Sequence, residues 1–170
     1  MMHYLAEEDA RLSAAMRMAE NHRFIRTVAA FLAHSGDSWF WLIGLALLWW
    51  LGTDYWKTRA IAFAIGVVAT AAVVFAIKFL VRRRRPEGEW GQIYRQTDPH
   101  SFPSGHAARG VMLAVLALGI GPCWLGAVLL PWALLVGLAR VSLGVHYLSD
   151  VLAGMVVGAV MGWAVMVFIF

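Results

Sequence analysis

Long uncharged stretches separated by short polar breaks dominate the chain. Four stretches contain no Asp, Glu, Lys or Arg: residues 38–53, 60–77, 110–139 and 151–170. The third has 30 residues and is interrupted by Gly119-Ile120-Gly121-Pro122, which predicts two helices joined by a tight turn. A membrane-spanning helix needs about 20 apolar residues. The pattern therefore predicts five spans, near residues 38–52, 58–81, 104–120, 123–141 and 146–169.

The segment before residue 38 has a different pattern. Its apolar positions follow near-helical spacing at Leu5, Leu12, Met16 and Ala19, with charges of both signs between them. This spacing predicts an amphipathic helix on the membrane surface, and a solvated tail is the alternative. A second apolar stretch, residues 24–33, is too short to span a bilayer.

These elements predict an all-α fold with two parts. Residues 38–170 are expected to form a polytopic membrane helical bundle of about five transmembrane helices, and residues 1–37 an amphipathic interfacial segment. The composition agrees, because 61% of the residues are hydrophobic and only 14% are charged, with a mean hydropathy of +0.69. The net charge of +4 favours anionic lipid head groups and a phosphorylated substrate over nucleic acid in so apolar a chain.

Polar residues suited to chemistry gather at the ends of the predicted spans. Helices that alternate in direction bring the end of the second span, the start of the third, the end of the fourth and the start of the fifth to one side of the membrane. These ends carry Lys78, Arg85-Pro86, Pro103-Ser104-Gly105-His106, Arg140, His146 and Asp150. Three cations, two histidines and a carboxylate together suit a phosphate monoester or a pyrophosphate.

The second span is predicted to end in a pair of phosphate-binding cations. Lys78 and Arg85 are seven residues apart, which is two helical turns, so both should point from one helix face. Pro86 then ends the helix. The three arginines between them are interpreted as anchors to lipid head groups: Arg82, Arg83 and Arg84. For Lys78 alone, the alternative is a lysine that snorkels at a helix end.

The third span opens with a motif suited to anion binding. Ser104 is a favourable N-cap residue, and the free N–H groups of a first helical turn bind anions. Gly105 allows an oxyanion to approach the backbone. His106 lies in that turn, where an imidazole can protonate a leaving oxygen. An interfacial histidine beside an ordinary cap is the alternative.

The fifth span begins with a histidine and a carboxylate one turn apart. Asp150 follows His146 at i+4, so it can reach back, fix the tautomer of the ring and leave the other nitrogen free to attack. The alternative for Asp150 is a charge that interacts with the helix dipole. Arg140 can hold phosphate oxygens with its planar fork. Cys123 is the single cysteine, and no carboxylate pair lies near these motifs, so neither a metal nor another cofactor is predicted.

The motifs Lys78-x6-Arg85-Pro86, Pro103-Ser104-Gly105-His106 and Arg140-x5-His146-x3-Asp150 together resemble the signature of the type 2 phosphatidic acid phosphatase superfamily. Its members are integral-membrane lipid phosphatases that need no metal. The resemblance implies that His146 is a nucleophile that forms a phosphohistidine, that Asp150 orients it and that His106 protonates the leaving group. It also implies a set of phosphate ligands: Lys78, Arg85, Ser104, Gly105 and Arg140.

Two departures from the family pattern stand out. Ala139 precedes the arginine of the third motif, where a serine is common, so one hydroxyl contact to phosphate is missing. Many members also have six spans, whereas the pattern here predicts five and a surface helix.

We expect an enzyme of the bacterial plasma membrane that hydrolyses a lipid phosphate or diphosphate. Candidate substrates are undecaprenyl diphosphate, phosphatidylglycerol phosphate, phosphatidate and a lipid A phosphate. A phosphotransferase using the same phosphohistidine, and a non-enzymatic lipid or anion transporter, are the alternatives. The surplus of basic residues on the motif side favours a cytoplasmic site, while bacterial relatives often face outward, so both orientations stay open.

Small residues repeat every four positions in the last span, at Gly154, Gly158 and Gly162. Glycines at this spacing let a neighbouring helix approach closely. The pattern predicts tight packing within the chain, with a homodimer interface as the alternative.

Overall fold

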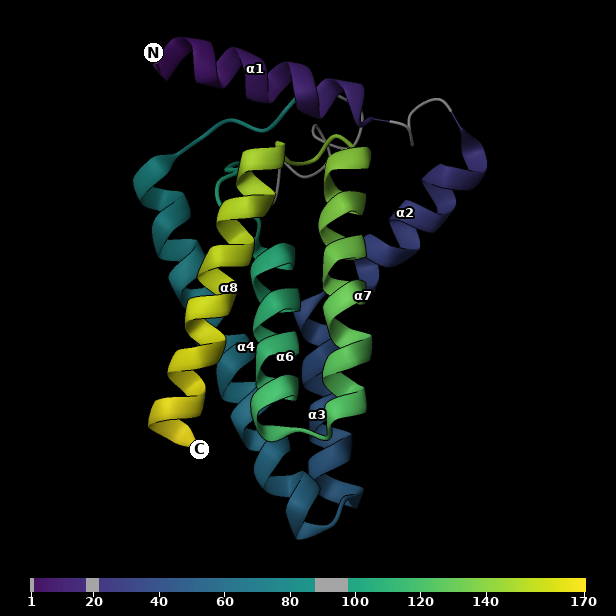
Figure 1. Cartoon of the computed structure of the whole chain (residues 1–170), viewed down its shortest axis with the longest axis vertical. Coiled ribbons are helices and arrows are strands. Elements are labelled where there is room, and N and C mark those ends of the chain that lie inside the picture. Colours follow the sequence, from purple (N-terminus) through teal and green to yellow (C-terminus); the bar gives the residue numbers. More distant parts are fainter. Residues whose placement is uncertain (1, 18–21, 88–97) are drawn as a thin grey trace.

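The computed structural model describes residues 2–17, 22–87 and 98–170. These ranges are mainly α-helical, with an isolated β-bridge between Arg84 and His100. The helices are α1 (Met2–Ala15), α2 (Arg23–Ser35), α3 (Ser38–Leu51), α4 (Asp54–Val81), α6 (Gly105–Ile120), α7 (Cys123–Ser142) and α8 (Leu148–Ile169). Helices α3, α4, α6, α7 and α8 run along the bundle, and α1 lies across one end (Figure 1). The all-α prediction is confirmed.

The helices differ in their ability to cross a membrane. Helices α4, α7 and α8 are each long and apolar enough to cross alone, and α2 and α3 pass the same test as a pair bent by 52°. Helix α6 has 16 residues, a length of about 24 Å, which is shorter than a hydrocarbon core of about 30 Å. All five predicted segments form helices, but by length and composition the described residues supply three spans, or four with the bent pair.

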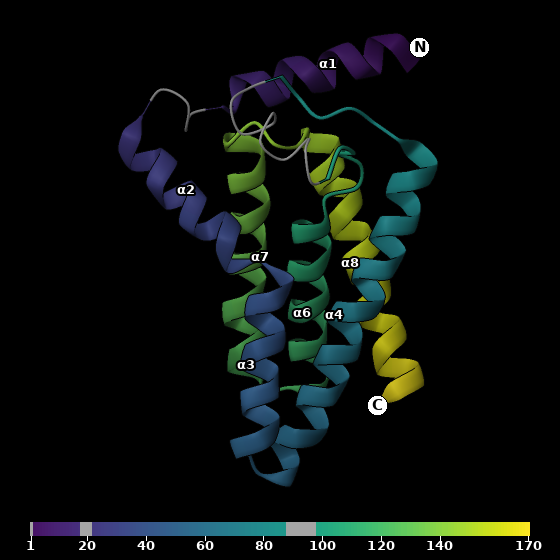
Figure 2. The same ribbon diagram turned by 180° about the vertical axis from the view of Figure 1, so that it is seen from behind.

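Helix α6 lies at the centre of the bundle. It runs between α7 and α8, and α4 covers a further side (Figures 1 and 2). Met112, Leu113 and Leu116 of α6 are fully buried and belong to one core cluster with Phe63 and Val67 of α4. Because neighbouring helices enclose α6, it does not need the length of a helix that faces lipid.

Helix α2 packs against the bundle with one face. Ala29 and Ala33 pack against Ala139, Leu143 and Val145 at the end of α7. Seen from behind, α2 leans out from the bundle and meets α3 beside α7 (Figure 2). The break between α2 and α3 therefore lies against the bundle interior.

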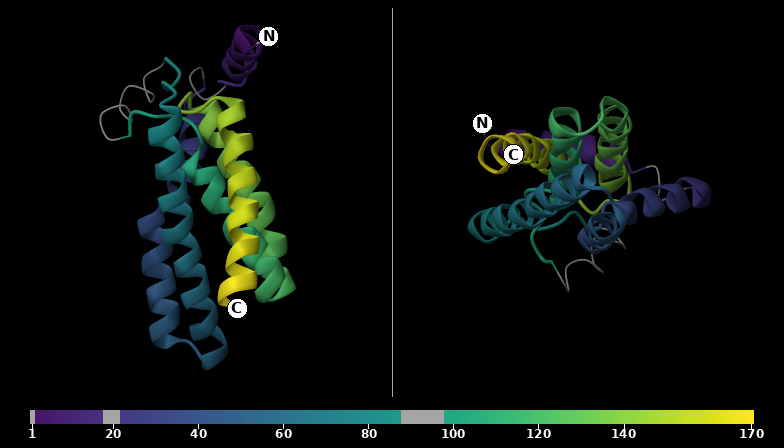
Figure 3. Two further views of the ribbon diagram at one scale, coloured as in Figure 1. Left: turned by 90° about the vertical axis from the view of Figure 1, so that its left-hand side faces the viewer. Right: turned by 90° about the horizontal axis from the view of Figure 1, so that it is seen from below.

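The ends that carry the predicted motifs meet at one end of the bundle. Helix α4 ends there, α6 begins there, α7 ends there and α8 begins there, as helices of alternating direction require (Figure 1). The turn between α3 and α4 lies at the opposite end, away from α1 (Figure 3). Helix α6 begins deeper in the bundle than α8, which leaves room for a recessed site.

The glycine stripe of α8 packs against α6. A Cβ atom at Gly154 would meet the carbonyl oxygen of Ser104, and one at Gly158 would meet that of Ala108. All three glycines are buried inside the chain, so they offer no surface to a second copy. The alternative of a homodimer through Gly154, Gly158 and Gly162 is therefore wrong, and the stripe serves intramolecular packing.

Gly158→Ala should destabilise the bundle, because its new methyl group would press on the α6 backbone. We expect a loss of about 1–3 kcal/mol, the usual cost of overpacking a close contact. Gly44→Ala is the matched control, since nothing lies within 4 Å of a Cβ atom at Gly44 of α3. Thermal unfolding in one detergent measures both. Equal stability of the two variants would contradict the close α6–α8 contact.

Candidate active site

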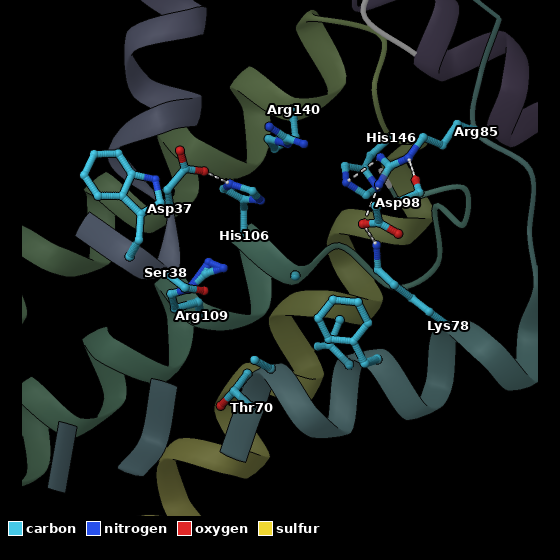
Figure 4. Close-up of a pocket in the computed structure, with 15 residues that line it drawn as sticks. Asp37, Ser38, Thr70, Lys78, Arg85, Asp98, His106, Arg109, Arg140 and His146 are labelled. Atoms are coloured by element: carbon cyan, nitrogen blue, oxygen red, sulfur yellow. Dashed lines mark hydrogen bonds and ion pairs between the residues drawn. The ribbon is translucent and has the colours of Figure 1, made fainter. Parts of the chain in front are cut away.

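A cavity of about 510 Å³ opens at the motif end of the bundle (Figure 4). Six predicted site residues line it: Lys78, Arg85, Gly105, His106, Arg140 and His146. The other two, Ser104 and Asp150, are fully buried beside it. Further polar side chains line the cavity without having been predicted as site residues: Asp37, Ser38, Thr70, Asp98 and Arg109. The structure thus brings together residues from three distant motifs.

Lys78 and Arg85 come together by a different route from the one predicted. Helix α4 ends at Val81, and Arg82 has a left-handed backbone with φ of 52°. Arg85 therefore lies beyond the helix, and the prediction that both cations share one helix face, with Pro86 ending the helix, is wrong. They meet through Asp98, whose Oδ2 accepts hydrogen bonds from Lys78 Nζ and from Arg85 Nη2, the latter at 2.8 Å.

His146 and Asp150 lie close together at the start of α8. His146 Nδ1 is 3.6 Å from Asp150 Oδ2, an electrostatic contact longer than a hydrogen bond. His146 Nε2 is 3.2 Å from Arg85 Nη1. This arrangement favours the tautomer with the proton on Nδ1, facing the carboxylate, and the lone pair on Nε2, facing the guanidinium.

The surroundings of His146 keep its ring neutral. Burial lowers the pKa of His146 well below its ordinary value of 6.5, and the positive charges of Arg140, Arg85 and Lys78 lower it further. A neutral imidazole retains the lone pair that a nucleophile needs. Protonation, and with it the loss of that lone pair, therefore requires a more acidic solution than an exposed histidine would.

Arg83 is bound inside the protein and is not a head-group anchor, which corrects the interpretation from sequence. It donates to Asp150 Oδ1 at 2.7 Å, to Ser149 Oγ at 2.6 Å and to Asp9 Oδ2 at 2.7 Å. Although burial opposes it, the carboxylates of Asp9 and Asp150 raise the pKa of Arg83. Arg83 thus holds Asp150 from the side opposite His146. A run of four arginines carries no signal that could have singled it out.

Helix α1 caps the start of α8 from far away in sequence. The backbone N–H of Leu148 donates to Ser13 Oγ at 2.8 Å, and that of Ser149 donates to Asp9 Oδ1 at 3.1 Å. The first N–H groups of a helix lack intrahelical partners, so α1 satisfies two of them. Through Asp9 and Arg83, the N-terminal helix also supports Asp150.

A second pair of histidine and carboxylate lies across the cavity. His106 Nε2 is 2.8 Å from Asp37 Oδ1, and Asp37 comes from the break between α2 and α3. The break is held in place because Arg109 Nη1 donates to the carbonyl oxygen of Gly36 at 2.7 Å. No motif or periodicity in the sequence marks Asp37, so its contact with His106 was missed.

Ser104 occupies the N-cap position of α6 but makes no side-chain cap. Its backbone N–H donates to the carbonyl oxygen of Asp150 at 2.9 Å, so this N–H group helps to join α6 to α8. Its hydroxyl is buried and has no hydrogen-bond partner among the described residues. Gly105, by contrast, lines the cavity.

Positive side chains supply the charge of the cavity wall. Lys78, Arg85, Arg109 and Arg140 are all buried and all line the cavity. Within residues 2–17, 22–87 and 98–170, no group of three or more His, Cys, Asp or Glu side chains is arranged to hold a metal ion. An anion with several oxygens is the ligand that such a wall fits best.

Comparison with known proteins identifies relatives. Residues 59–170 match the model of the PAP2 superfamily. The decaprenylphosphoryl-5-phosphoribose phosphatase of Mycobacterium tuberculosis is 35% identical over 133 residues, which cover 77% of this chain and 73% of that protein. The undecaprenyl-diphosphatase of Sulfolobus acidocaldarius is 31% identical over 135 residues, covering 76% and 63%. The crystal structure of a PAP2-type phosphatidylglycerolphosphate phosphatase from Bacillus subtilis superposes with a TM-score of 0.80 at 21% identity, covering 97% and 86%.

Arg83→Lys should lower turnover of a lipid phosphate on the order of 100-fold, the scale of a misplaced reacting group. Lysine keeps the charge but cannot bind Asp150, Ser149 and Asp9 with one planar fork. Arg82→Lys is the control, because the Arg82 side chain is exposed and, within the described part of the chain, donates to Phe79 of its own helical turn. Steady-state kinetics on both variants is the measurement. A small and equal loss would show that Arg83 does not support the site.

Proposed function

The chain belongs to the PAP2 superfamily of membrane lipid phosphatases, and we propose that it removes phosphate through a phosphohistidine formed on His146. The observation that carries this proposal is the position of His146 Nε2 at 3.2 Å from Arg85, on the wall of a basic cavity, with Asp150 behind the ring. The ring is thus oriented and neutral, and its unprotonated Nε2 lies beside Arg85 on the cavity wall, where a phosphate can bind.

The phosphate would be held by the cations of the cavity wall. Phosphoryl transfer redistributes charge over the phosphate oxygens without adding to it, so catalysis depends on positioning and on fixed positive charge. Lys78, Arg85 and Arg140 supply that charge, and Gly105 at the start of α6 lets an oxygen approach the backbone. Ser104 offers a buried hydroxyl beside them.

The reaction would run in two balanced steps. In the first, the lone pair of His146 Nε2 forms a bond to phosphorus, the bond from phosphorus to the lipid oxygen breaks, and His106 gives that oxygen a proton. In the second, water attacks phosphorus, His106 takes the released proton, and the nitrogen–phosphorus bond breaks. Free phosphate leaves, and both histidines return to their starting states.

The shape of the cavity suits a lipid whose tail stays in the bilayer. Its lining includes Trp39 and Phe75, whose side chains are 63% and 53% exposed on the apolar face of the bundle. A long apolar chain could rest on these side chains while its terminal phosphate reaches His146. Two relatives act on polyprenyl-linked phosphates by name, so we propose a polyprenyl phosphate or diphosphate as the first substrate class to test.

Two alternatives to hydrolysis remain from the sequence. A transporter without enzymatic activity is disfavoured, because these relatives are phosphatases by name. A phosphotransferase would pass the phosphoryl group from His146 to an alcohol, and analysis of products as free phosphate or phosphorylated acceptor separates it from a hydrolase.

His146→Ala should abolish phosphate release from every lipid in a panel of monoesters and diphosphates, because no nucleophile remains. Asp150→Asn should lower it about 10³-fold or more, the scale of losing a carboxylate that fixes a histidine tautomer. Helical content by circular dichroism serves as the folding control. Near-normal release by the His146 variant would overturn the mechanism.

Asp37→Asn should impair proton donation by His106 and therefore act selectively. We expect kcat/KM to fall about 100-fold for an alkyl phosphate, whose leaving oxygen needs a proton, a typical contribution of general acid catalysis. For nitrophenyl phosphate, whose leaving group departs without one, the loss should be much smaller. Equal losses on both substrates would mean that Asp37 has only a structural role.

A further inference from the structure

Asp98 lines the cavity between two of the cations proposed to bind phosphate (Figure 4). Its Oδ2 accepts from Lys78 Nζ and Arg85 Nη2, and its backbone carbonyl oxygen accepts from Arg85 Nε at 2.7 Å. The Asp98 side chain is 29% exposed, whereas those of Lys78 and Arg85 are only 5% and 1% exposed. The carboxylate is therefore partly exposed and also contacts two buried cations.

A substrate phosphate needs the same donors that Asp98 occupies. The N–H groups that Lys78 and Arg85 direct at Oδ2 cannot be given fully to a carboxylate and to a phosphate at once. Buried cations also cannot be left without an anion at small cost. This geometry therefore allows the substrate phosphate to replace the Asp98 carboxylate, but not to bind beside it.

We propose that Asp98 is an internal competitor for phosphate, acting on turnover through Lys78 and Arg85. Its carboxylate neutralises the two cations while the cavity is empty. It turns toward water when the substrate phosphate binds, and it returns to help inorganic phosphate leave. The inference rests on the proposed function, because it requires that Lys78 and Arg85 bind the substrate phosphate.

The charges of the two anions make this exchange workable. A carboxylate carries one negative charge and two oxygens, whereas a terminal phosphate carries about 1.5 to 2 negative charges at pH 7 and three oxygens. Phosphate can therefore displace Asp98. Its net binding free energy is less favourable than in a basic cavity that holds no carboxylate. Tight binding of substrate and product alike would not raise kcat. A competitor for phosphate therefore lowers the catalytic rate little, and it speeds release of the product.

Asp98→Asn tests this directly, because asparagine keeps an acceptor oxygen for Lys78 and Arg85 but removes the charge. Inorganic phosphate is the probe, used on the full chain in detergent as a product inhibitor and in titration calorimetry. We expect its inhibition constant and its Kd to fall at least about tenfold, given the coupling energies of close charge pairs. The KM for the lipid phosphate should fall as well, with kcat unchanged or lower.

Asp98→Ala and Glu87→Gln complete the design. Asp98→Ala should also bind phosphate more tightly, and phosphate should raise its melting temperature more than that of the unmodified chain. Glu87→Gln removes an acidic side chain that lines the neighbouring surface pocket with Arg85, and it should leave the phosphate Kd unchanged. If Asp98 merely braced Lys78 and Arg85, both Asp98 variants would bind phosphate more weakly, and that result overturns the proposal, as does an unchanged Kd.

Calorimetric titration and turnover assays together separate this inference from the proposed function. Tighter phosphate binding by Asp98→Asn, together with normal turnover by His146→Ala, would leave the competitor standing and remove the nucleophile. Loss of turnover by His146→Ala, with no change in phosphate binding by Asp98→Asn, would support the nucleophile and overturn the competitor.

Discussion

Compensation of buried positive charge shapes the motif end of this bundle. Lys78 and Arg85 are almost fully buried in an otherwise apolar bundle, where an ionised group is costly without a partner. Asp98 supplies that partner for both cations. The carboxylate of Asp150, which is fully buried, in turn depends on Arg83. Lys78, Arg85 and Asp150 thus each face a side chain of opposite charge, and a phosphate that binds here adds a further negative charge to this set.

The fold makes such a site accessible by recessing one helix. Helix α6 is short and enclosed by its neighbours, and its first residues lie below the ends of α7 and α8 (Figure 1). The glycines of α8 allow α6 to approach so closely that Ser104 bonds to the backbone of Asp150. Backbone contact, rather than side-chain length, therefore sets the distance between the site residues at the start of α6 and those at the start of α8.

Much of the arrangement of the site could be predicted from the sequence, because it follows from the geometry of regular helices. Alternating helix direction placed the three motifs at one end, and the i, i+4 relation placed Asp150 beside His146. The position of Arg85 could not be predicted this way. Its segment leaves the helix at Arg82 and pairs with residues near His100, a tertiary contact that overrides helical continuation.

The carboxylates of Asp37, Asp98 and Asp9 were missed for a related reason. Each lies in a polar segment or on a polar helix face, where an acidic residue is ordinary and no periodicity marks it. Their partners, His106, Lys78 and Arg83, lie 69, 20 and 74 residues away. Only the folded chain brings these pairs together, and those of Asp37 and Asp9 connect the N-terminal segment to the proposed chemistry.

Trapping the phosphorylated enzyme would test whether His146 is the nucleophile. A lipid phosphate labelled in its terminal phosphoryl group would be mixed with the protein, quenched in alkali within one turnover and digested for mass spectrometry. We expect one acid-labile, alkali-stable phosphoryl group, carried by the peptide that contains His146 and absent from an unreacted control. Label on another residue, or a quenched enzyme with no label during active turnover, would contradict it.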